Sequence, residues 1–369
     1  MAHEFIDGST AIVRGALAAG CDFFAGYPIT PASPILQMMM TELPARGGVA
    51  IQGEDEIASI GMCIGATLAG ARTLTATSGP GISLYSENIG LAIIGEVPLV
   101  IVDVQRLGPA TGGATTVGQG DVQFVRWGTA GGYPIIALAP STVEECYSLT
   151  MRAFDLAERF RCPVFVLTDK DLNMTMRTVD PSALTDMVVR DRDLRRGDEG
   201  PPYRYHPPDG VPPMSRYGDE VMRFTGSSHG EDAVITKNPA AVGALNDHLA
   251  AKIDDHRAEI EMVTLDRQER AATLILAYGV TAGAARAAVR QTRAGGAAVS
   301  LLVVQSLWPV PEEAIGAALE GVTRVVVPEL NLGQYRREID RLASGREIVG
   351  VNRVDGKLIT PEQIVEALS

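Results

Sequence analysis

Short, nearly continuous apolar runs alternate with longer mixed segments from Phe5 to about Lys170. In the clearest run, Leu99–Val104, Asp103 is the one polar side chain. Strands that are apolar throughout and alternate with helices are typical of a parallel sheet covered on both faces. We expect strands at 23–25, 73–77, 99–104, 134–139 and 163–168, and helices at 10–19, 31–40, 54–69, 82–94 and 141–159.

Two of these helices have recognisable start signals. Thr30 followed by Pro31 predicts an N-cap and a first helical residue. Ser141, with Glu144 three positions later, is the pattern of a capping box. As a simple alternative to any functional role, the Thr30 hydroxyl is therefore interpreted as a helix cap.

The same rhythm returns near the C-terminus, whereas the middle of the chain lacks it. Three Pro-Pro pairs fall within 191–218, which we expect to be a surface linker or, alternatively, a segment ordered against a partner subunit. The expected strands here are 273–277, 299–304, 324–327 and 347–351, and the expected helices 240–261, 281–292, 311–319, 333–342 and 361–368. We predict three parts: 1–175, a linker with a polar helix at 176–270, and 271–369.

Charge and hydropathy exclude several classes of partner. The chain has 32 Lys and Arg against 45 Asp and Glu, a net charge of −13, which repels nucleic acid. No apolar run approaches the roughly 18 residues of a membrane span. Glu4 and Asp7 stand where a signal peptide has basic residues. We expect a cytoplasmic protein that binds neither nucleic acid nor membrane.

Cysteine and histidine spacing argues against a metal centre in this chain. The four cysteines are scattered without a C-x-x-C pair, and we expect them to be reduced, buried thiols. Iron–sulfur clusters generally need closely spaced thiolates. The five histidines form no ligand pair either, so we predict no metal site here.

Three polar positions occur at the ends of buried elements. Thr30 lies in a turn, Glu56 follows Glu54 at the start of an apolar helix, and Arg106 follows the strand 99–104. A buried acid is costly unless it has a partner. Strand ends in parallel sheets are where ligands bind, and a fixed guanidinium there suits a carboxylate. Singly, each residue also has a structural explanation, as a cap, a helix-dipole partner or a surface charge.

Taken together, the motifs resemble those of a known family. The first part resembles the thiamine-diphosphate pyrimidine-binding domain of 2-oxoacid:ferredoxin oxidoreductases, and the last part resembles that family's transketolase-C-like domain. The resemblance covers essentially the whole chain and implies an α subunit. It rests on Gly-Tyr-Pro-Ile-Thr-Pro (26–31), Glu-Asp-Glu-Ile-Ala (54–58), Thr-Ser-Gly-Pro-Gly (77–81), Val-Gln-Arg-x-Gly-Pro (104–109) and Val-Pro-Glu-Leu-Asn-Leu-Gly-Gln (327–334).

The resemblance implies roles for these positions. Glu56 matches the acid that hydrogen-bonds N1′ of the aminopyrimidine, which would make it the catalytic residue, with Glu54 as second choice. Thr30 and Arg106 match the positions that hold the 2-oxoacid carboxylate. The remaining implied cofactor-binding residues are Pro28, Ile29, Ser78 and Gly79.

The resemblance also implies a partner chain. In the family the diphosphate and Mg²⁺ are bound through a Gly-Asp-Gly motif, which is not in this sequence. We therefore expect a β subunit that carries the diphosphate, Mg²⁺ and a [4Fe-4S] cluster. Further γ and δ subunits, CoA, and ferredoxin as electron acceptor are also implied.

The substrate is open at this stage. The layout resembles the 2-oxoglutarate type, which forms succinyl-CoA or runs in reverse as a carboxylase. That type usually has a lysine where Thr116 stands, and a lysine could pair with a distal carboxylate. Branched-chain 2-oxoacids or pyruvate are therefore alternatives, and a non-enzymatic regulatory α/β module is a more distant one.

Overall fold

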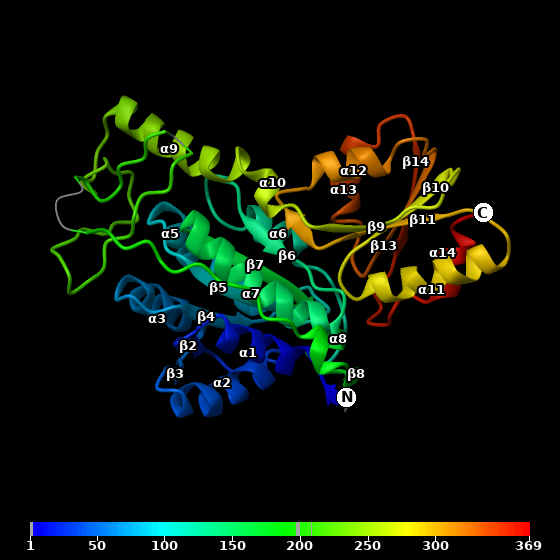
Figure 1. Cartoon of the computed structure of the whole chain (residues 1–369), viewed down its shortest axis with the longest axis horizontal. Helices are drawn as coiled ribbons and strands as arrows, with labels where there is room; N and C mark the ends of the chain where they lie inside the picture. The colour runs from blue at the N-terminus through cyan, green and yellow to red at the C-terminus, as the bar shows by residue number, and fades with distance from the viewer. Residues whose placement is uncertain (1–2, 197–199, 208) are drawn as a thin grey trace.

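Two α/β units lie side by side in the computed structural model, which describes residues 3–196, 200–207 and 209–369 (Figure 1). Met1 and Ala2 of the N-terminal stretch, residues 197–199 of the expected linker and Pro208 of the second Pro-Pro pair lie outside the described residues. The predicted α/β fold with parallel sheets is confirmed in both units.

The first unit is built on a seven-stranded sheet in the order β12-β6-β7-β5-β4-β2-β3. Its neighbouring strands are parallel except that β12 runs antiparallel to β6. The strands are β2 (Phe23–Gly26), β3 (Val49–Gln52), β4 (Thr73–Thr77), β5 (Leu99–Gln105), β6 (Ile136–Leu138), β7 (Pro163–Asp169) and β12 (Ser306–Trp308). A separate two-stranded sheet pairs β1 (Glu4–Ile6) with β8 (Arg177–Val179).

Both faces of this sheet are covered, as the continuous apolar strands predicted. Alternate residues of β5 enter different cores, because side chains along a strand point to opposite faces. On one face pack α1 (Gly8–Ala18), α2 (Ser33–Ala45) and α7 (Val143–Phe160). On the other pack α3 (Glu56–Leu68), α4 (Pro80–Leu84), α5 (Ser86–Ile94) and α6 (Val122–Trp127).

The second unit has a five-stranded sheet in the order β14-β13-β10-β11-β9. Its strands are β9 (Val263–Asp266), β10 (Thr273–Ala277), β11 (Ser300–Val304), β13 (Arg324–Glu329) and β14 (Glu347–Asn352). Its helices are α11 (Thr281–Ala294), α12 (Glu312–Ala318), α13 (Arg336–Leu342) and α14 (Pro361–Glu366). α11 and α14 cover the outer face, while α12 and α13 lie over the face that joins the first unit's core.

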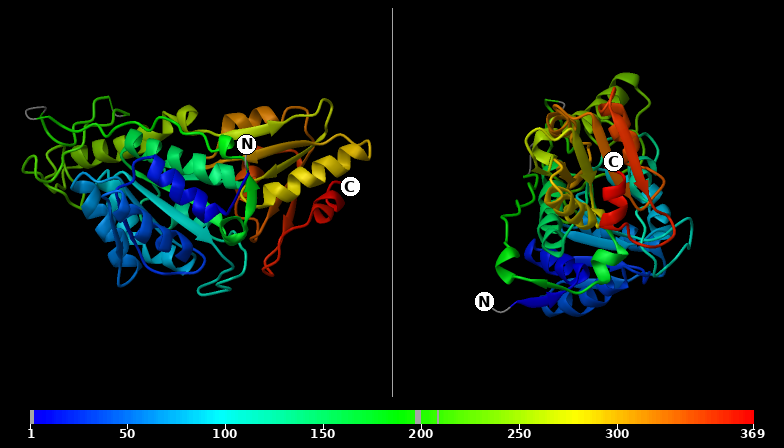
Figure 2. Two further views of the ribbon diagram at one scale, coloured as in Figure 1. Left: turned by 60° about the horizontal axis from the view of Figure 1, so that its bottom comes forward. Right: turned by 90° about the vertical axis from the view of Figure 1, so that its right-hand side faces the viewer.

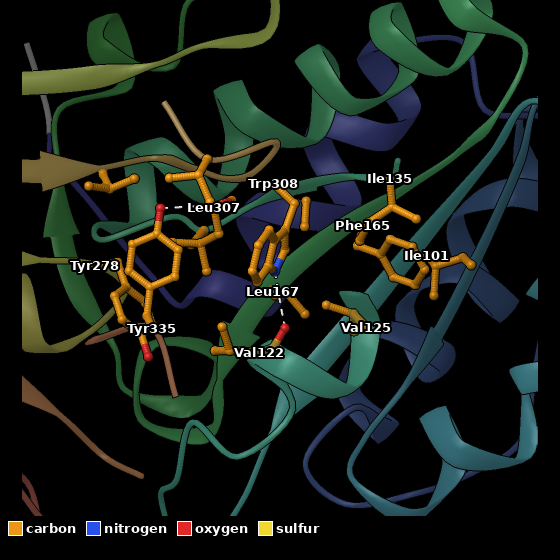
Figure 3. Close-up of a cluster of buried hydrophobic side chains, with 14 of the residues drawn as sticks. Ile101, Val122, Val125, Ile135, Phe165, Leu167, Tyr278, Leu307, Trp308 and Tyr335 are labelled. Carbon is orange, nitrogen blue, oxygen red and sulfur yellow. Dashed lines mark hydrogen bonds between the residues drawn. The ribbon is translucent and has the colours of Figure 1, made fainter. Parts of the chain in front are cut away.

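A shared apolar core therefore joins the two units (Figure 3). Trp308 lies at its centre, where its indole Nε1 donates a 3.1 Å hydrogen bond to the backbone oxygen of Val122. Tyr278 and Tyr335 pack edge to face beside it, with ring centroids 5.4 Å apart. Because β12 extends the first sheet, the second unit contributes directly to the first.

The middle segment is bound to the first unit, which corrects the expectation of a surface linker. It follows α8 (Lys170–Met174) and extends along that unit in Figures 1 and 2. It contains the 3-10 turn η1 (Pro181–Ala183), α9 (Pro239–Asp254) and α10 (Arg257–Ile260). Arg192 makes a bidentate pair with buried Glu158 at 2.7 and 2.9 Å and donates to two backbone oxygens after α3 and near its end. The side chains of Tyr203, Tyr205 and Met214 are buried. The described residues of the Pro-rich sequence thus form no helix or strand, but these contacts hold them against the first unit.

Several predicted boundaries were wrong for local reasons. The expected helix 82–94 is divided at Tyr85, and 240–261 is divided into α9 and α10. The cap of α7 is Thr142, whose hydroxyl accepts from the Glu145 N–H at 3.1 Å, while Ser141 donates to the Glu145 carboxylate. The strands β1, β3, β8, β9 and β12 were not expected, since each is short and carries polar or exposed positions.

Candidate functional site

The predicted site residues gather at one edge of the seven-stranded sheet. Strands β2, β4 and β5 are neighbours and parallel, so their carboxyl ends, at Gly26, Thr77 and Gln105, lie at the same edge. Ligands in open parallel sheets bind at this edge. Thr30, the loop Ser78–Gly79 and Arg106 follow these strands directly.

Glu56 occupies the first position of α3 and lies inside the molecule. Its exposed fraction is 6%, whereas Glu54 and Asp55 are exposed. Asp55 caps the helix, because its carboxylate accepts the Ala58 N–H at 2.7 Å. The structure thus directs Glu56 inward and leaves the second choice, Glu54, at the surface.

Glycine at position 81 permits the approach of Glu56 to the Thr77 loop. A methyl group on Gly81 would lie 3.0 Å from Cγ and Oε1 of Glu56 and would collide with Oγ1 of Thr77. The Thr-Ser-Gly-Pro-Gly motif therefore lets this loop lie close to the buried acid without a side chain at position 81 between them.

Arg106 is 5% exposed and is held against the Thr30 turn. Its Nη1 donates a 2.5 Å hydrogen bond to the Thr30 backbone oxygen, and Gly79 packs against its side chain. Its Nε is buried and has no partner among the described residues. The alternative of a surface arginine is therefore wrong.

Thr30 does not cap a helix. The chain turns at residues 30–32, where the Ser33 N–H bonds to the Ile29 oxygen at 2.9 Å, so α2 begins at Ser33 with Ala32 as N-cap. Pro34 rather than Pro31 takes the early helical position, where the missing N–H costs nothing. Thr30 instead lies half-buried beside Arg106.

The other predicted cofactor-binding residues differ in their surroundings. Ser78 is fully buried, and Gly79 has φ +43°, a conformation that favours glycine. Pro28 is exposed and Ile29 half-buried on the turn before Thr30.

Buried polar atoms without a partner are concentrated at this edge. Within the described part of the chain they include Thr77 Oγ1, Ser78 Oγ, both carboxylate oxygens of Asp103, Arg106 Nε and Asp121 Oδ2. Such atoms cost free energy unless something binds them. Their clustering indicates a polar ligand site.

A cavity of about 710 Å³ opens beside Arg106. It is lined from the first unit by Gly79, Arg106 and Asp121 and from the second unit by the loop after β13, residues 330–332. The site thus lies between the two units.

The loop after β13 belongs to the motif at 327–334, but the sequence did not predict what its residues contact. Asn331 donates to the Gln119 oxygen at 2.7 Å and to Tyr278 Oη at 3.0 Å, and Gln119 accepts the Leu330 N–H at 3.1 Å. Buried Glu329 accepts from Tyr278 Oη at 2.8 Å, and burial raises its pKa. This network fastens the second unit to the loop that precedes Asp121.

Asp103 and Asp121 were also missed as members of the site. Asp103 is fully buried, and burial together with the facing Asp121 carboxyl raises its pKa well above the ordinary value. The signal was in the sequence, since Asp103 is the polar residue within an otherwise apolar strand.

Thr116 has a packing role in the structure. It is half-buried, and a methyl group on Gly356 would collide with its Cγ2. Position 116 therefore faces the second unit.

Known proteins resemble this chain over its whole length. A family model described as pyruvate flavodoxin/ferredoxin oxidoreductase, thiamine diphosphate-binding, matches residues 14–241, and the pyruvate:ferredoxin oxidoreductase core domain II matches 271–364. The 2-oxoglutarate synthase subunit KorA of Methanothermobacter thermautotrophicus is 40% identical over 99% of this chain and 97% of its own length. The ketoisovalerate oxidoreductase subunit VorB of the same organism is 36% identical over 100% and 97%.

Solved structures show the same relationship. The 2-oxoglutarate:ferredoxin oxidoreductase of Magnetococcus marinus, solved with 2-oxoglutarate, coenzyme A and succinyl-CoA bound, matches with a TM-score of 0.93 and 32% identity. The match covers 99% of this chain and 64% of that one. A split-gene transketolase, 14% identical with a TM-score of 0.57, shares the fold.

Proposed function

Because this chain belongs to the 2-oxoacid:ferredoxin oxidoreductase family, we propose that it is the α subunit of an enzyme that oxidatively decarboxylates 2-oxoglutarate. CoA would take up the product as succinyl-CoA and ferredoxin the electrons, or the reaction would run in reverse. The KorA relatives and the Magnetococcus marinus enzyme support this substrate more strongly than VorB supports a branched-chain one. The convergence of Glu56, Thr30 and Arg106 at one sheet edge is the observation that carries the proposal.

The residues around Glu56 fit a thiamine diphosphate pyrimidine ring. A buried carboxyl group lies beside the free hydroxyls of Thr77 and Ser78, in a space that a side chain at position 81 would fill. When bound, thiamine diphosphate supplies a carbon nucleophile for the 2-oxo carbonyl. Glu56 would bind the ring through a nitrogen and hold a proton there, while Pro28, Ile29, Ser78 and Gly79 would line the ring.

Arg106 and Thr30 would bind the 2-oxoacid carboxylate. The guanidinium is held by the Thr30 backbone oxygen, and its buried Nε remains available. A charge-assisted hydrogen bond in such a site is shorter and stronger than a neutral one. The carboxylate would thus be fixed while the carbonyl group faces the cofactor.

A partner subunit would complete the site. The sequence has no Gly-Asp-Gly motif for the diphosphate. Across the described ranges no group of His, Cys, Asp and Glu is arranged to hold a metal. We place Mg²⁺ and the [4Fe-4S] cluster on a β subunit, with γ and δ subunits as further members of the complex.

The exposed face of α3 is where this β subunit would bind. The helix begins at Glu56, and its outer side carries exposed Ile57 and Met62 together with Gly61 and Gly65, which have open space around them. A smooth apolar face adjoining an incomplete site suits a permanent partner.

We also propose a cytoplasmic location, on the evidence of the cysteines. All four cysteines are free and buried, as predicted, which agrees with the reducing cytoplasm. None of the helices formed by the described residues combines the length and hydropathy that crossing a bilayer requires.

Co-expression with the β subunit encoded beside this chain would test the function. We expect reduction of a viologen dye with CoA and 2-oxoglutarate to require both chains, and 2-oxoglutarate to be preferred over 2-oxoisovalerate and pyruvate. A complex that binds thiamine diphosphate but turns over no 2-oxoacid would contradict the proposal.

A further inference from the structure

Two buried acids lie close to Arg106, the residue proposed to bind the substrate carboxylate. Asp103 is on β5, three residues before Arg106, and is fully buried; Asp121 precedes α6 and lines the cavity beside Arg106. Their carboxyl groups face each other, and the Gly79 N–H faces Asp103. Even so, neither Asp103 oxygen nor Asp121 Oδ2 has a partner of good hydrogen-bonding geometry among the residues described.

Two carboxyl groups in such contact cannot both be ionised at moderate cost. Burial and mutual repulsion favour a state in which they share one proton. Burial raises the pKa of both groups, and for Asp121 the hydrogen-bonding contact with Asp103 and then the charge of Arg106 partly offset the rise. The pair therefore keeps one proton to a higher pH than two separate carboxyl groups would.

Charged or titratable groups from neighbouring elements are Arg106, Glu56 and Asp169, which ends β7 beside Gln105 and whose pKa burial raises to about 7. Arg106 follows β5 and attracts Asp121, and Glu56 lies beyond the Thr77 loop at the start of α3. The second unit contributes neutral side chains to this part of the cavity, Asn331 and Gln334. The charge of the acid pair therefore has a strong influence on Arg106.

We propose that Asp103 and Asp121 are a proton-sharing pair of positioning residues that keeps Arg106 available for the 2-oxoacid carboxylate. With one proton, the pair and Arg106 together are neutral, and the site accepts an anion. After loss of that proton, two negative charges would repel the substrate. The inference rests on the proposed function, because it assigns the carboxylate to Arg106.

The pair also joins the loops on either side of Arg106. Asp103 faces the Gly79 loop. The Asp121 N–H donates a 3.1 Å hydrogen bond to Oε1 of Gln105. The preceding Gln119 is fastened to the second unit through Leu330 and Asn331. The acid pair therefore lies between the Gly79 loop and a segment that is fastened to the second unit.

The test is Asp103→Asn in the reconstituted αβ complex. The amide can donate to Asp121 and accept from Gly79 but cannot titrate, so it mimics the protonated acid. For the wild type we expect KM for 2-oxoglutarate to rise about tenfold per pH unit at alkaline pH, once the pair loses its proton. In Asp103→Asn the KM should stay flat over this range.

Asp103→Leu is the control of matched shape. It cannot hydrogen-bond, so KM should increase about tenfold or more at every pH. Equal behaviour of the Leu and Asn variants would overturn the proposal, as would an Asn variant with the wild-type pH profile.

Infrared difference spectroscopy gives a readout that does not require turnover. At neutral pH the difference between the wild-type and Asp103→Asn spectra should contain the carbonyl stretch of a protonated carboxylic acid, contributed by the wild type. The band in a complex inactive toward every 2-oxoacid would support the proton sharing while contradicting the proposed function. Its absence from an active wild type would overturn the inference alone.

Discussion

At the scale of single residues, the first turn of α3 separates three neighbouring acids into different roles. Asp55 is used as the helix cap, which leaves Glu54 at the surface and directs Glu56 into the site. A one-residue shift of the helix start would exchange these positions. The burial of Glu56 thus depends on where the helix begins.

Glu56→Gln should reduce turnover of the complex by about 10²–10⁴-fold, because the amide cannot exchange a proton with the cofactor ring. Steady-state assays of the αβ complex would measure the loss, and gel filtration would check assembly. Glu54→Gln is the matched control and should leave both unchanged. Near-normal turnover in Glu56→Gln would remove this residue from the chemistry.

Arg106→Ala should mainly weaken 2-oxoacid binding. Truncating one partner of a buried charge pair costs about 2–5 kcal/mol, so KM should rise by at least an order of magnitude, more than kcat falls. Arg106→Lys retains the charge but not the forked geometry, so its KM should lie between those of the wild type and Arg106→Ala. Unchanged saturation with 2-oxoglutarate would place the substrate elsewhere.

Sequence reasoning could find Thr30, Glu56 and Arg106 because each directly follows or begins a strongly patterned element. It ranked Glu56 before Glu54 only through the family resemblance, because which of the two is buried depends on the register of one helical turn. It did not find the Asp103–Asp121 pair, since the two acids are brought together by tertiary folding. The contact of Thr116 with Gly356 was not foreseen for the same reason, because Gly356 is remote in the chain.

At the scale of elements, a buried charge cluster fastens α9 to the first unit. Glu96, fully buried after α5, accepts from His248 at 2.9 Å and pairs with Lys252 at 3.0 Å, both on α9. Lys252 also donates to the Arg161 oxygen, and Tyr205 stacks on His248. These contacts explain why a segment without regular pattern is nevertheless ordered.

Glu96→Gln should destabilise the chain by about 3–5 kcal/mol at neutral pH, because Lys252 would lose its buried counter-charge. Urea unfolding would measure the change, with exposed Glu54→Gln as control. The neighbouring cations hold the pKa of Glu96 below its usual value of 4.5. Its contribution is therefore present above about pH 4.5 and lost as pH falls below it, so the stability difference between wild type and variant should narrow in acid.

The element pattern was predictable where strands are buried on both faces. Strands β4, β5, β7 and β10 are buried over their whole length or nearly so, and their ranges were close to those expected. The missed strands β3 and β9 are edge strands with exposed residues, so neither composition nor alternation identifies them. Their pairing depends on neighbours that a local pattern does not include.

At the scale of the whole molecule, the outer face of α3 is the surface on which assembly should depend. Gly65→Lys adds a long charged side chain there and should abolish binding of the β subunit while the chain stays folded. Gly283→Lys on α11 is the matched control, since Gly283 is also an exposed helical glycine with open space around it. Co-purification would measure assembly; equal yields of complex from both variants would place the interface elsewhere.

Strand β12 has a consequence for any attempt to recombine this protein with its relatives. By position in the chain it belongs to the second unit, but it hydrogen-bonds to β6 of the first, and Trp308 inserts beside Val122. In a chimaera joined near residue 271, where the second family region begins, β12 would come from one parent and its partner β6 from the other. The natural cassette for exchange is therefore the whole chain, because the boundary between its halves in space does not coincide with the boundary in sequence.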